Sequence, residues 1–184
     1  DWVQNSAPYM VNVIAVAVGQ SRSETASIHH GGITSESFKC IDFDCVSVTG
    51  TGSQLVVAGG VFIRAPTGER YLFDRLHSDA STSTSRTIQK YASSVQYPNG
   101  EVITYTYQTG TIPGDQFNRT FYRPNRVSTN VGYHIDIACQ VDGTNASVLN
   151  WGTVREATLY AAAAPSVALQ RLTYGLDGSI TDLG

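Results

Sequence analysis

The chain has 184 residues, with 12 basic and 15 acidic side chains and a net charge of −3. This length is enough for one domain with a core, since folding at this size buries roughly 70% of the unfolded surface. The balanced charge argues against a nucleic-acid partner, because proteins that bind nucleic acid carry a clear excess of basic residues. The sequence contains no apolar run of about 18 residues, so no membrane-spanning helix is predicted. Because the first residue is Asp1, we expect a processed product or a piece of a longer protein.

Residues 1–26 are expected to form an extended segment followed by a strand, and residues 27–184 to form one β-hairpin domain. The stretch from Tyr9 to Val18 is uncharged and rich in β-branched residues, which indicates a buried strand rather than a helix. Such a strand could pair with a neighbouring subunit, as in strand addition, and build a filament. The alternative is a first strand that folds back onto its own sheet. The face that would meet a neighbour consists of Tyr9, Val11, Val13, Ala15 and Ala17.

Three cysteines leave at least one thiol unpaired. Cys40 and Cys45 are spaced so that they could form a disulfide across the end of a hairpin, which would contribute about 2 kcal/mol. The alternative is two buried thiols. A zinc site needs four ligands, and only Cys139 remains.

The segment from Val61 to Tyr107 holds two copies of one pattern. Each copy places a turn dipeptide, Thr67-Gly68 or Asn99-Gly100, between two strand-like runs. Glycine at such a position tolerates the positive φ that tight hairpin turns require. Both copies therefore predict β-hairpins, and most other segments look like weaker versions of the same pattern.

Later segments continue this alternation of strands and turns. The polar stretch 76–86 is expected to be a loop, and residues 117–122 and 126–128 to be two short strands. Residues 132–140 alternate like a half-buried strand, and 153–160 and 170–174 are also expected to be strands. A third, looser turn-and-strand copy follows at 176–181, so that an edge is left open at the end of the chain. The predicted fold is all-β, with successive antiparallel hairpins forming a curved sheet wall and little helix.

Candidate chemical groups are sparse. Adjacent residues on a strand point to opposite faces, so His29 and His30 are expected to be ordinary polar side chains rather than metal ligands. Asp42 and Asp44 are expected to lie in a solvated loop, with a calcium site as the alternative. No Gly-x-Ser-x-Gly elbow and no phosphate-binding glycine loop occur. We therefore predict no catalytic residue, no cofactor and no metal. Tyr122 with Trp151 is a candidate aromatic platform for glycans.

Several of these segments resemble the repeats of RHS/YD-repeat proteins. The resemblance rests on short motifs within residues 27–184 and departs from the family because the naming Tyr-Asp pair is absent. It implies a hollow β-strand shell, usually in secreted or cell-surface proteins, which often encloses a toxic C-terminal domain, and it suggests a bacterial source. The motifs are Tyr97 to Gly100 followed by Ile103 to Tyr107, Gly68 to Asp74, Arg126 to Tyr133, and Leu172 to Asp182.

The resulting expectation is a non-enzymatic extracellular structural segment of an RHS/YD-repeat-like shell or assembly. Its partners would be the remainder of a longer chain or neighbouring subunits, including copies of itself. Two alternatives stay open: a carbohydrate- or cell-surface-binding module, and a filament subunit that assembles through the N-terminal strand.

Overall fold

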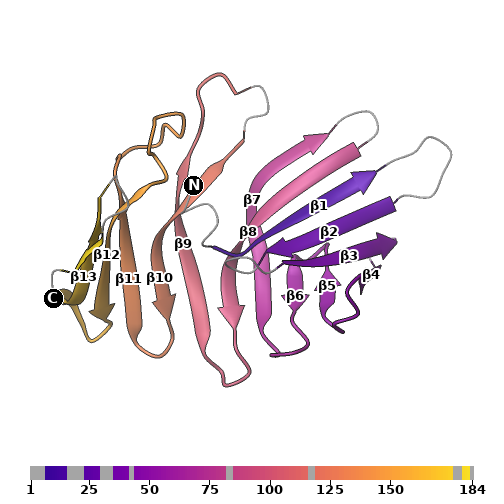
Figure 1. Ribbon diagram of the computed structural model, residues 1–184, viewed down its shortest axis with the longest axis horizontal. Coiled ribbons are helices and arrows are strands. Elements are labelled where there is room, and N and C mark those ends of the chain that lie inside the picture. The colour runs from indigo at the N-terminus through magenta and orange to yellow at the C-terminus, as the bar shows by residue number, and fades with distance from the viewer. Residues whose placement is uncertain are drawn as a thin grey trace.

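A computed structural model describes residues 7–15, 23–29, 35–41, 44–81, 85–115, 119–175 and 180–182. Regular structure in these residues is entirely β-strand, and the strands form one antiparallel sheet (Figure 1). No helix within these ranges is long and apolar enough to cross a membrane. The strands are β1 (Tyr9–Ala15), β2 (Ser23–His29), β3 (Ser35–Ile41), β4 (Asp44–Ser47), β5 (Gln54–Val56), β6 (Val61–Ile63), β7 (Arg70–Ser81), β8 (Ser85–Gln96), β9 (Val102–Gly110), β10 (Phe121–Thr129), β11 (Tyr133–Cys139), β12 (Val154–Ala161), β13 (Ala164–Tyr174) and β14 (Ile180–Asp182).

The strands follow one another in chain order, each antiparallel to the next, and β1 pairs additionally with β8. That pairing closes β1 to β8 into a ring. Val11 in β1, for example, lies opposite Ser27 in β2 and Gln89 in β8. The backbone of β1 is therefore hydrogen-bonded along both edges, as buried backbone groups require.

The interior of the ring is the main hydrophobic core. β3 alternates strictly between exposed and buried positions, so that Phe38 and Cys40 point inward. This period of two is what a half-buried strand requires. The core side chains come from β1, β2, β3, β5, β6, β7 and β8 and from the turn after β5, and they include Met10, Ile28, Phe38, Leu55, Val57, Phe62, Tyr71, Phe73, Ala92 and Val95.

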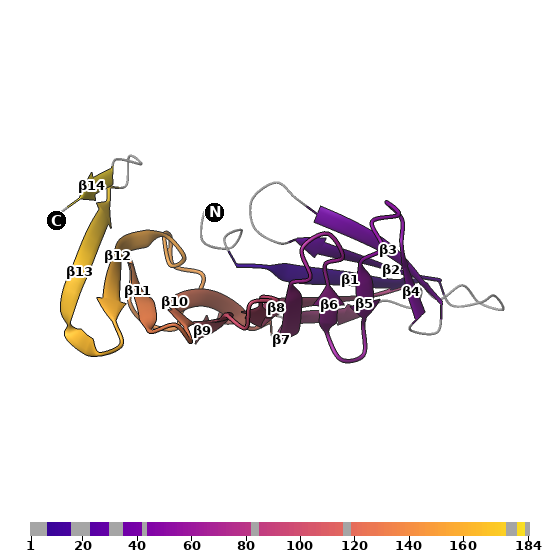
Figure 2. The same ribbon diagram turned by 90° about the horizontal axis from the view of Figure 1, so that it is seen from below.

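The ring joins the rest of the sheet at a fork in β8. β7 pairs with almost the full length of β8, whereas the opposite edge is shared: residues 85–91 pair with β1 and residues 94–96 pair with β9. A register shift lies at this point, because Leu72 pairs with Ser94 but Phe73 pairs with Ala92. A bulge bends a strand locally and changes its twist. From the fork, β9 to β14 continue as a single layer beside the two layers of the ring (Figure 2).

The all-β antiparallel fold and both expected hairpins are confirmed. The Thr67-Gly68 turn joins β6 to β7, and Asn99-Gly100 joins β8 to β9. The structure corrects three local expectations. Within 76–86, β7 continues to Ser81 and β8 begins at Ser85, because each strand satisfies the polar backbone of the other. Residues 121–122 and 126–128, expected to belong to two short strands, lie in one strand, β10, which is interrupted by a bulge at Asn125, and residues 117–118 lie outside the described residues. β13 begins at Ala164 instead of residue 170.

The N-terminal strand does not have the free edge that assembly by strand addition requires. β1 is paired on one side with β2 and on the other with β8, all within one chain. The inter-subunit interpretation of Tyr9, Val11, Val13 and Ala15 is therefore wrong for the described strand, and the fold-back alternative holds. Ala17 lies outside the described residues, and the expected boundary after residue 26 falls within β2.

Candidate functional site

The open sheet carries a continuous row of apolar side chains from β9 to β12. Tyr105 lies opposite Val127, Val127 opposite Ile135, and Ile135 opposite Leu159. Directly paired residues of adjacent strands share one face of a sheet, so these four form one apolar row. Its members are half-buried except Ile135, which is 39% exposed.

The neighbouring positions form a polar row on the opposite face. Its members, paired in register from β9 to β13, are Thr106, Arg126, Asp136, Thr158 and Arg171. The Arg126 guanidinium binds both carboxylate oxygens of Asp136, with N–O distances of 2.5 Å and 2.9 Å. This hydrogen bonding holds the pKa of Asp136 below its usual value. An exposed pair of this kind contributes little stability. Thr158 in the same row is 2% exposed, so water reaches only part of this face.

The two rows give the open sheet one apolar and one polar face. Antiparallel sheets with this pattern normally pack the apolar face against a second layer. In the ring, β1 to β3 supply that layer for β5 to β8 (Figure 2). No second layer of described residues covers the apolar row of β9 to β12 in the same way.

An aromatic cluster fills the fork between the ring and the open sheet. Tyr91 of β8 lies at its centre and is 3% exposed. Its ring centroid lies 6.1 Å from that of Tyr107, 5.9 Å from that of Tyr122 and 5.7 Å from that of His77. The Tyr107 hydroxyl donates a 2.6 Å hydrogen bond to the Ala92 carbonyl. Burial raises the pKa of Tyr91 to about 12 and raises that of Tyr107 as well. Both phenols therefore stay protonated well above neutral pH.

Arg123 anchors the loop between β11 and β12 against the polar face. It is only 3% exposed. Its guanidinium lies 4.4 Å from the Trp151 ring and donates hydrogen bonds to the Gln108 side chain and to the carbonyls of Val141 and Trp151. A Cβ on Gly110 would lie 2.5 Å from the Trp151 ring. The Trp151 ring therefore leaves no room for a side chain at Gly110, and it is also the ring against which the buried Arg123 packs.

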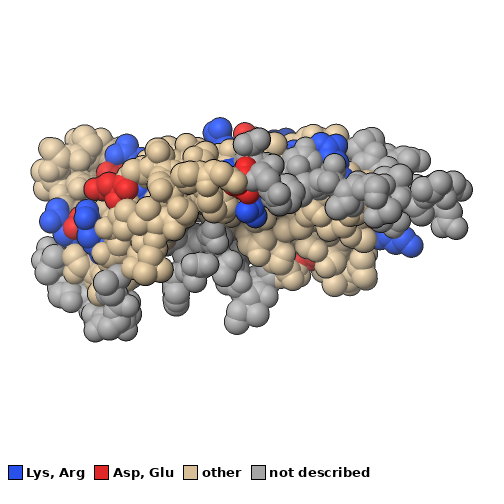
Figure 3. All heavy atoms as spheres, turned by 90° about the horizontal axis from the view of Figure 1, so that it is seen from above, with Lys and Arg blue, Asp and Glu red and all other residues tan. Residues whose placement is uncertain are grey.

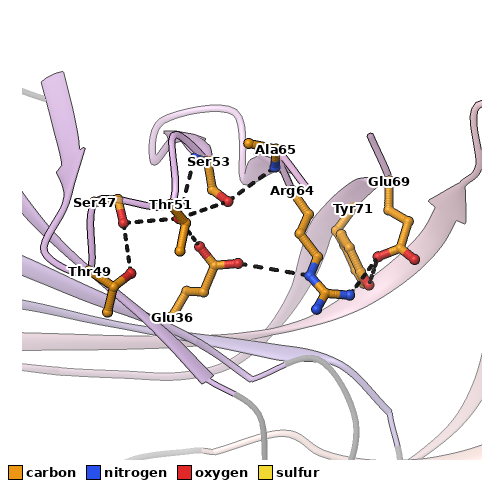
Figure 4. A network of polar contacts seen from close by, with 9 residues as sticks. All are labelled: Glu36, Ser47, Thr49, Thr51, Ser53, Arg64, Ala65, Glu69 and Tyr71. Atoms are coloured by element: carbon orange, nitrogen blue, oxygen red, sulfur yellow. Dashed lines mark hydrogen bonds and ion pairs between the residues drawn. The ribbon is translucent and has the colours of Figure 1, made fainter. Parts of the chain in front are cut away.

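A polar network lies at one end of the ring (Figure 4). The Thr51 hydroxyl donates a 2.8 Å hydrogen bond to buried Glu36 and lies 3.1 Å from the Ser53 oxygen. That oxygen accepts a 3.1 Å hydrogen bond from the Ala65 amide. The Ser53 hydroxyl is 5% exposed and engaged with the backbone, so it joins two loops and is not presented as a nucleophile.

The same network continues through Arg64. Its guanidinium lies 4.0 Å from Glu36 and 3.4 Å from Glu69 (Figure 4). Tyr71 donates a 2.9 Å hydrogen bond to Glu69, and burial together with this bond raises the pKa of Tyr71. Each carboxylate has a cation and a hydroxyl beside it, as buried charges require. The network therefore stabilises the end of the ring where the β4–β5 loop meets the β6–β7 turn.

The candidate glycan platform is not formed. Trp151 is 5% exposed and lies under Arg123 on the polar face. Tyr122 precedes Arg123 and points to the other face, where its ring centroid lies 5.7 Å from that of Tyr107. Consecutive residues on a strand point to opposite sides of the sheet, so the expected pairing of Tyr122 with Trp151 is wrong.

The remaining candidate residues have structural surroundings. Cys40 and Cys45 lie opposite each other in β3 and β4 and form a disulfide, while Cys139 is a buried free thiol. The His29 ring stacks on Tyr9 with centroids 4.3 Å apart, and Asp44 is exposed. His30 and Asp42 lie outside the described residues. Within the ranges that the structure describes, no three His, Cys, Asp or Glu side chains gather as metal ligands.

Charged side chains are scattered over the face drawn in Figure 3, and most of its described atoms belong to uncharged residues. A nucleic-acid interface would show Lys and Arg gathered into a stripe. The described part of this face has no such stripe. Sequence reasoning missed Arg123 and His77 as central side chains, because neither stands in a motif.

Comparisons with known proteins find little. No protein-family profile matches the chain, and no curated protein matches it. The chain is similar to a solved structure, the crystal structure of TcdB2-TccC3-Cdc42, at 10% identity and a TM-score of 0.43. The alignment covers 90% of this chain and 11% of that chain, so this chain spans about a ninth of that protein's length. A similarity this low supports no functional argument.

Proposed function

We propose that the protein is a non-enzymatic structural segment of an RHS/YD-repeat-like β-wall, part of a shell or an assembly. One observation carries this proposal: the apolar row of Tyr105, Val127, Ile135 and Leu159 has no described layer over it, while the opposite face is charged. A wall segment needs such a two-sided sheet. The partner would be the remainder of a longer chain or neighbouring subunits.

The packing within the ring supports this proposal. Ile103 and Tyr105 of β9 pack against the ring core, so the apolar row begins at a dry interface that already exists. Contiguous apolar surface on a soluble protein marks a place where another macromolecule binds. The succession of Gly-centred hairpins, which resembles RHS/YD repeats, extends the sheet one strand at a time and supports the same interpretation.

We further propose a secreted or cell-surface location. The Cys40–Cys45 disulfide supports it, because structural disulfides persist in oxidising compartments and are rare in the cytosol. The low content of charged residues, 15%, is in keeping with this. Mass determination of the protein from its native source, with and without alkylation, would show whether both cysteines are oxidised there.

The structural proposal is tested by charging the apolar row. Ile135→Lys places a cation on the apolar row, and Thr106→Lys places the same cation on the polar row as a control. We expect the unmodified chain to bind a hydrophobic dye such as ANS and to self-associate in sedimentation velocity. Ile135→Lys should weaken both, with no effect from Thr106→Lys. A monomeric unmodified chain that binds no dye would overturn the proposal.

A further inference from the structure

Strand β13 is the last long strand of the sheet and lies at the end farthest from the ring (Figure 2). One of its edges pairs with β12 from Ala164 to Thr173. On the other edge, which we call the outer edge, β14 pairs only with Leu172, Thr173 and Tyr174. Among the described residues, no strand therefore lies beside the outer edge from Ala164 to Leu169.

The outer edge lacks most of the features that keep strands apart. An open edge offers N–H and C=O groups to another strand, and proteins usually protect it with charged side chains, proline or a bulge. Residues 164–169 carry no charge, and Pro165 lies next to the beginning of the strand. The register shifts of this part of β13 are with β12, on the inner edge. Val167 is 59% exposed and Leu169 is 50% exposed, so apolar surface accompanies the open edge.

The chemistry of this edge fits a second copy of the same edge. β13 is antiparallel to both β12 and β14, so a further neighbour in the same pattern is antiparallel too. Two identical edges pair in this way about a two-fold axis, and the donors of each copy then meet the acceptors of the other. Like charges directly opposite each other destabilise a strand pair. Because residues 164–169 are uncharged, self-pairing brings no like charges together.

The position of β14 selects the register of such a pair. A two-fold axis at Val167 keeps the beginning of β13 in the second copy clear of β14. An axis at Ala168 would place Ala164 of the second copy opposite Leu172, which already pairs with Asp182 of β14. An axis nearer the beginning of β13 would shorten the pairing. Val167 therefore marks the longest self-pairing that the described β14 allows.

We propose that the outer edge of β13 is a homodimer interface, in which two copies pair antiparallel about a two-fold axis at Val167. The two Val167 side chains lie beside each other, and Leu169 lies beside Pro165 of the second copy. The pairing joins two sheets into one and stops at two copies, because both use the same edge. A single pair of short strands is only marginally stable, so the dimer is weak and is best detected by a covalent trap.

Cysteine crosslinking of the full chain tests this pairing. Directly opposed residues of antiparallel strands have Cα atoms about 4.5–5.5 Å apart, a distance that a disulfide spans. Val167→Cys should therefore form a disulfide-linked dimer under mild oxidation. The native cysteines do not interfere, because Cys40 and Cys45 are bonded to each other and Cys139 is buried.

Two further variants serve as controls, and both change exposed side chains. In Leu169→Cys, the same pairing places the two new thiols about 13 Å apart along the strands, which is too far for a disulfide. Leu149→Cys lies in the loop between β11 and β12, where the side chain is 82% exposed, and it measures crosslinking by random collision.

Val167→Cys should crosslink roughly tenfold faster than Leu149→Cys on non-reducing gels, because pairing raises the effective concentration of the thiols. Leu169→Cys should crosslink no faster than Leu149→Cys. Equal rates for Val167→Cys and Leu149→Cys, or crosslinking of Leu169→Cys as fast as that of Val167→Cys, would overturn the proposal.

The dimer uses an edge of the sheet, so it is independent of the apolar row on its face. Adding Ile135→Lys to Val167→Cys should leave the crosslinking rate unchanged, even where Ile135→Lys alone weakens dye binding. A crosslinking rate that falls to that of Leu149→Cys in the double variant would assign the contact to the apolar row and overturn pairing through β13.

Discussion

Single glycines decide how closely two strands approach in this fold. Gly60 has a φ of +63°, and a Cβ built on it would lie 2.1 Å from the Phe73 carbonyl oxygen. The close approach lets the Phe73 amide donate a 2.7 Å hydrogen bond to the Gly60 carbonyl. Gly100 also has a positive φ, of +87°, but its Cβ would meet nothing within 4 Å.

The two glycines make a matched pair for testing this difference. Gly100→Ala should cost about 1–2 kcal/mol, the usual penalty for a left-handed L-residue. Gly60→Ala should cost several kcal/mol, because backbone must also move away from the new methyl group. Urea unfolding of both variants measures the two costs, and equal destabilisation would contradict the close approach at Gly60.

Buried phenols give the protein an alkaline limit to its stability. Burial raises the pKa of Tyr91 and of Tyr105 to about 12, from an ordinary value of 10.0. The folded state thus keeps protons that the unfolded state loses, so stability is complete below about pH 10 and falls between about pH 10 and pH 12. Unfolding free energies measured across this range should decline together with the appearance of tyrosinate absorbance. Tyrosinate that forms without any loss of stability would contradict burial.

Within β10, two arginines three residues apart show what burial does to the same side chain. Arg123 is buried, stacks on Trp151 and bonds to neutral acceptors. Arg126 is about half exposed and bonds to Asp136. Removing Arg123 leaves carbonyls of the β11–β12 loop without their donor, whereas water replaces the Arg126 contacts.

Alanine substitution in β10 should therefore give unequal results. Arg123→Ala should lose about 3 kcal/mol, because it removes packing and leaves buried acceptors unsatisfied. Arg126→Ala should lose at most about 1 kcal/mol. Thermal unfolding compares the two, and tryptophan fluorescence reports whether Trp151 becomes exposed in Arg123→Ala. A larger loss from Arg126→Ala would contradict this assignment.

The disulfide acts on the β3–β4 hairpin. It closes a loop of sequence separation 5, for which the chain-entropy model predicts about 2 kcal/mol. The double variant Cys40→Ser with Cys45→Ser should lose about that amount in urea unfolding. A reducing agent should destabilise the unmodified protein to the same extent and leave the double variant unchanged. Equal stability of the two proteins would show that the disulfide contributes nothing.

At the scale of the whole molecule, the ring and the open sheet should differ in stability. Strands of the ring are paired on both sides around a shared core, whereas β13 is largely exposed. Native proteins open locally where few apolar contacts hold the backbone. Amides of β1 and β8 should therefore exchange only through global unfolding, and those of β13 much faster.

Proline substitutions test the same contrast. Val11→Pro removes a donor from a strand that is paired on both edges and should cost about 2–3 kcal/mol. Val167→Pro lies where β13 is exposed and its register with β12 is irregular, and it should cost under about 1 kcal/mol. A Val11→Pro protein as stable as the unmodified chain would contradict closure of the ring by β1.

Local sequence was sufficient to predict the succession of hairpins and the two turns Thr67-Gly68 and Asn99-Gly100, although not every strand boundary. Thr67-Gly68 and Asn99-Gly100 direct the chain back on itself through short-range backbone preferences, and alternating side chains then show which residues share a face. The possible disulfide, for which two buried thiols were the alternative, was also visible in local sequence, since Cys40 and Cys45 lie within one hairpin. Chemical groups outside recognisable motifs, such as His77 and Arg123, carried no local signal.

The tertiary structure alone decided where the sheet closes and where it stays open. Closure depends on β1 pairing with residues 85–91 of β8, a contact between residues 70 to 82 positions apart that no short motif encodes. The bulge beside Ala92 then divides one edge of β8 between β1 and β9. That division gives the first strand two neighbours, places His77 and Tyr91 at the fork, and leaves the apolar row of β9 to β12 without a described second layer. Turns are set by the few residues within them, whereas partners for a strand edge are set by competition among all strands that can reach it.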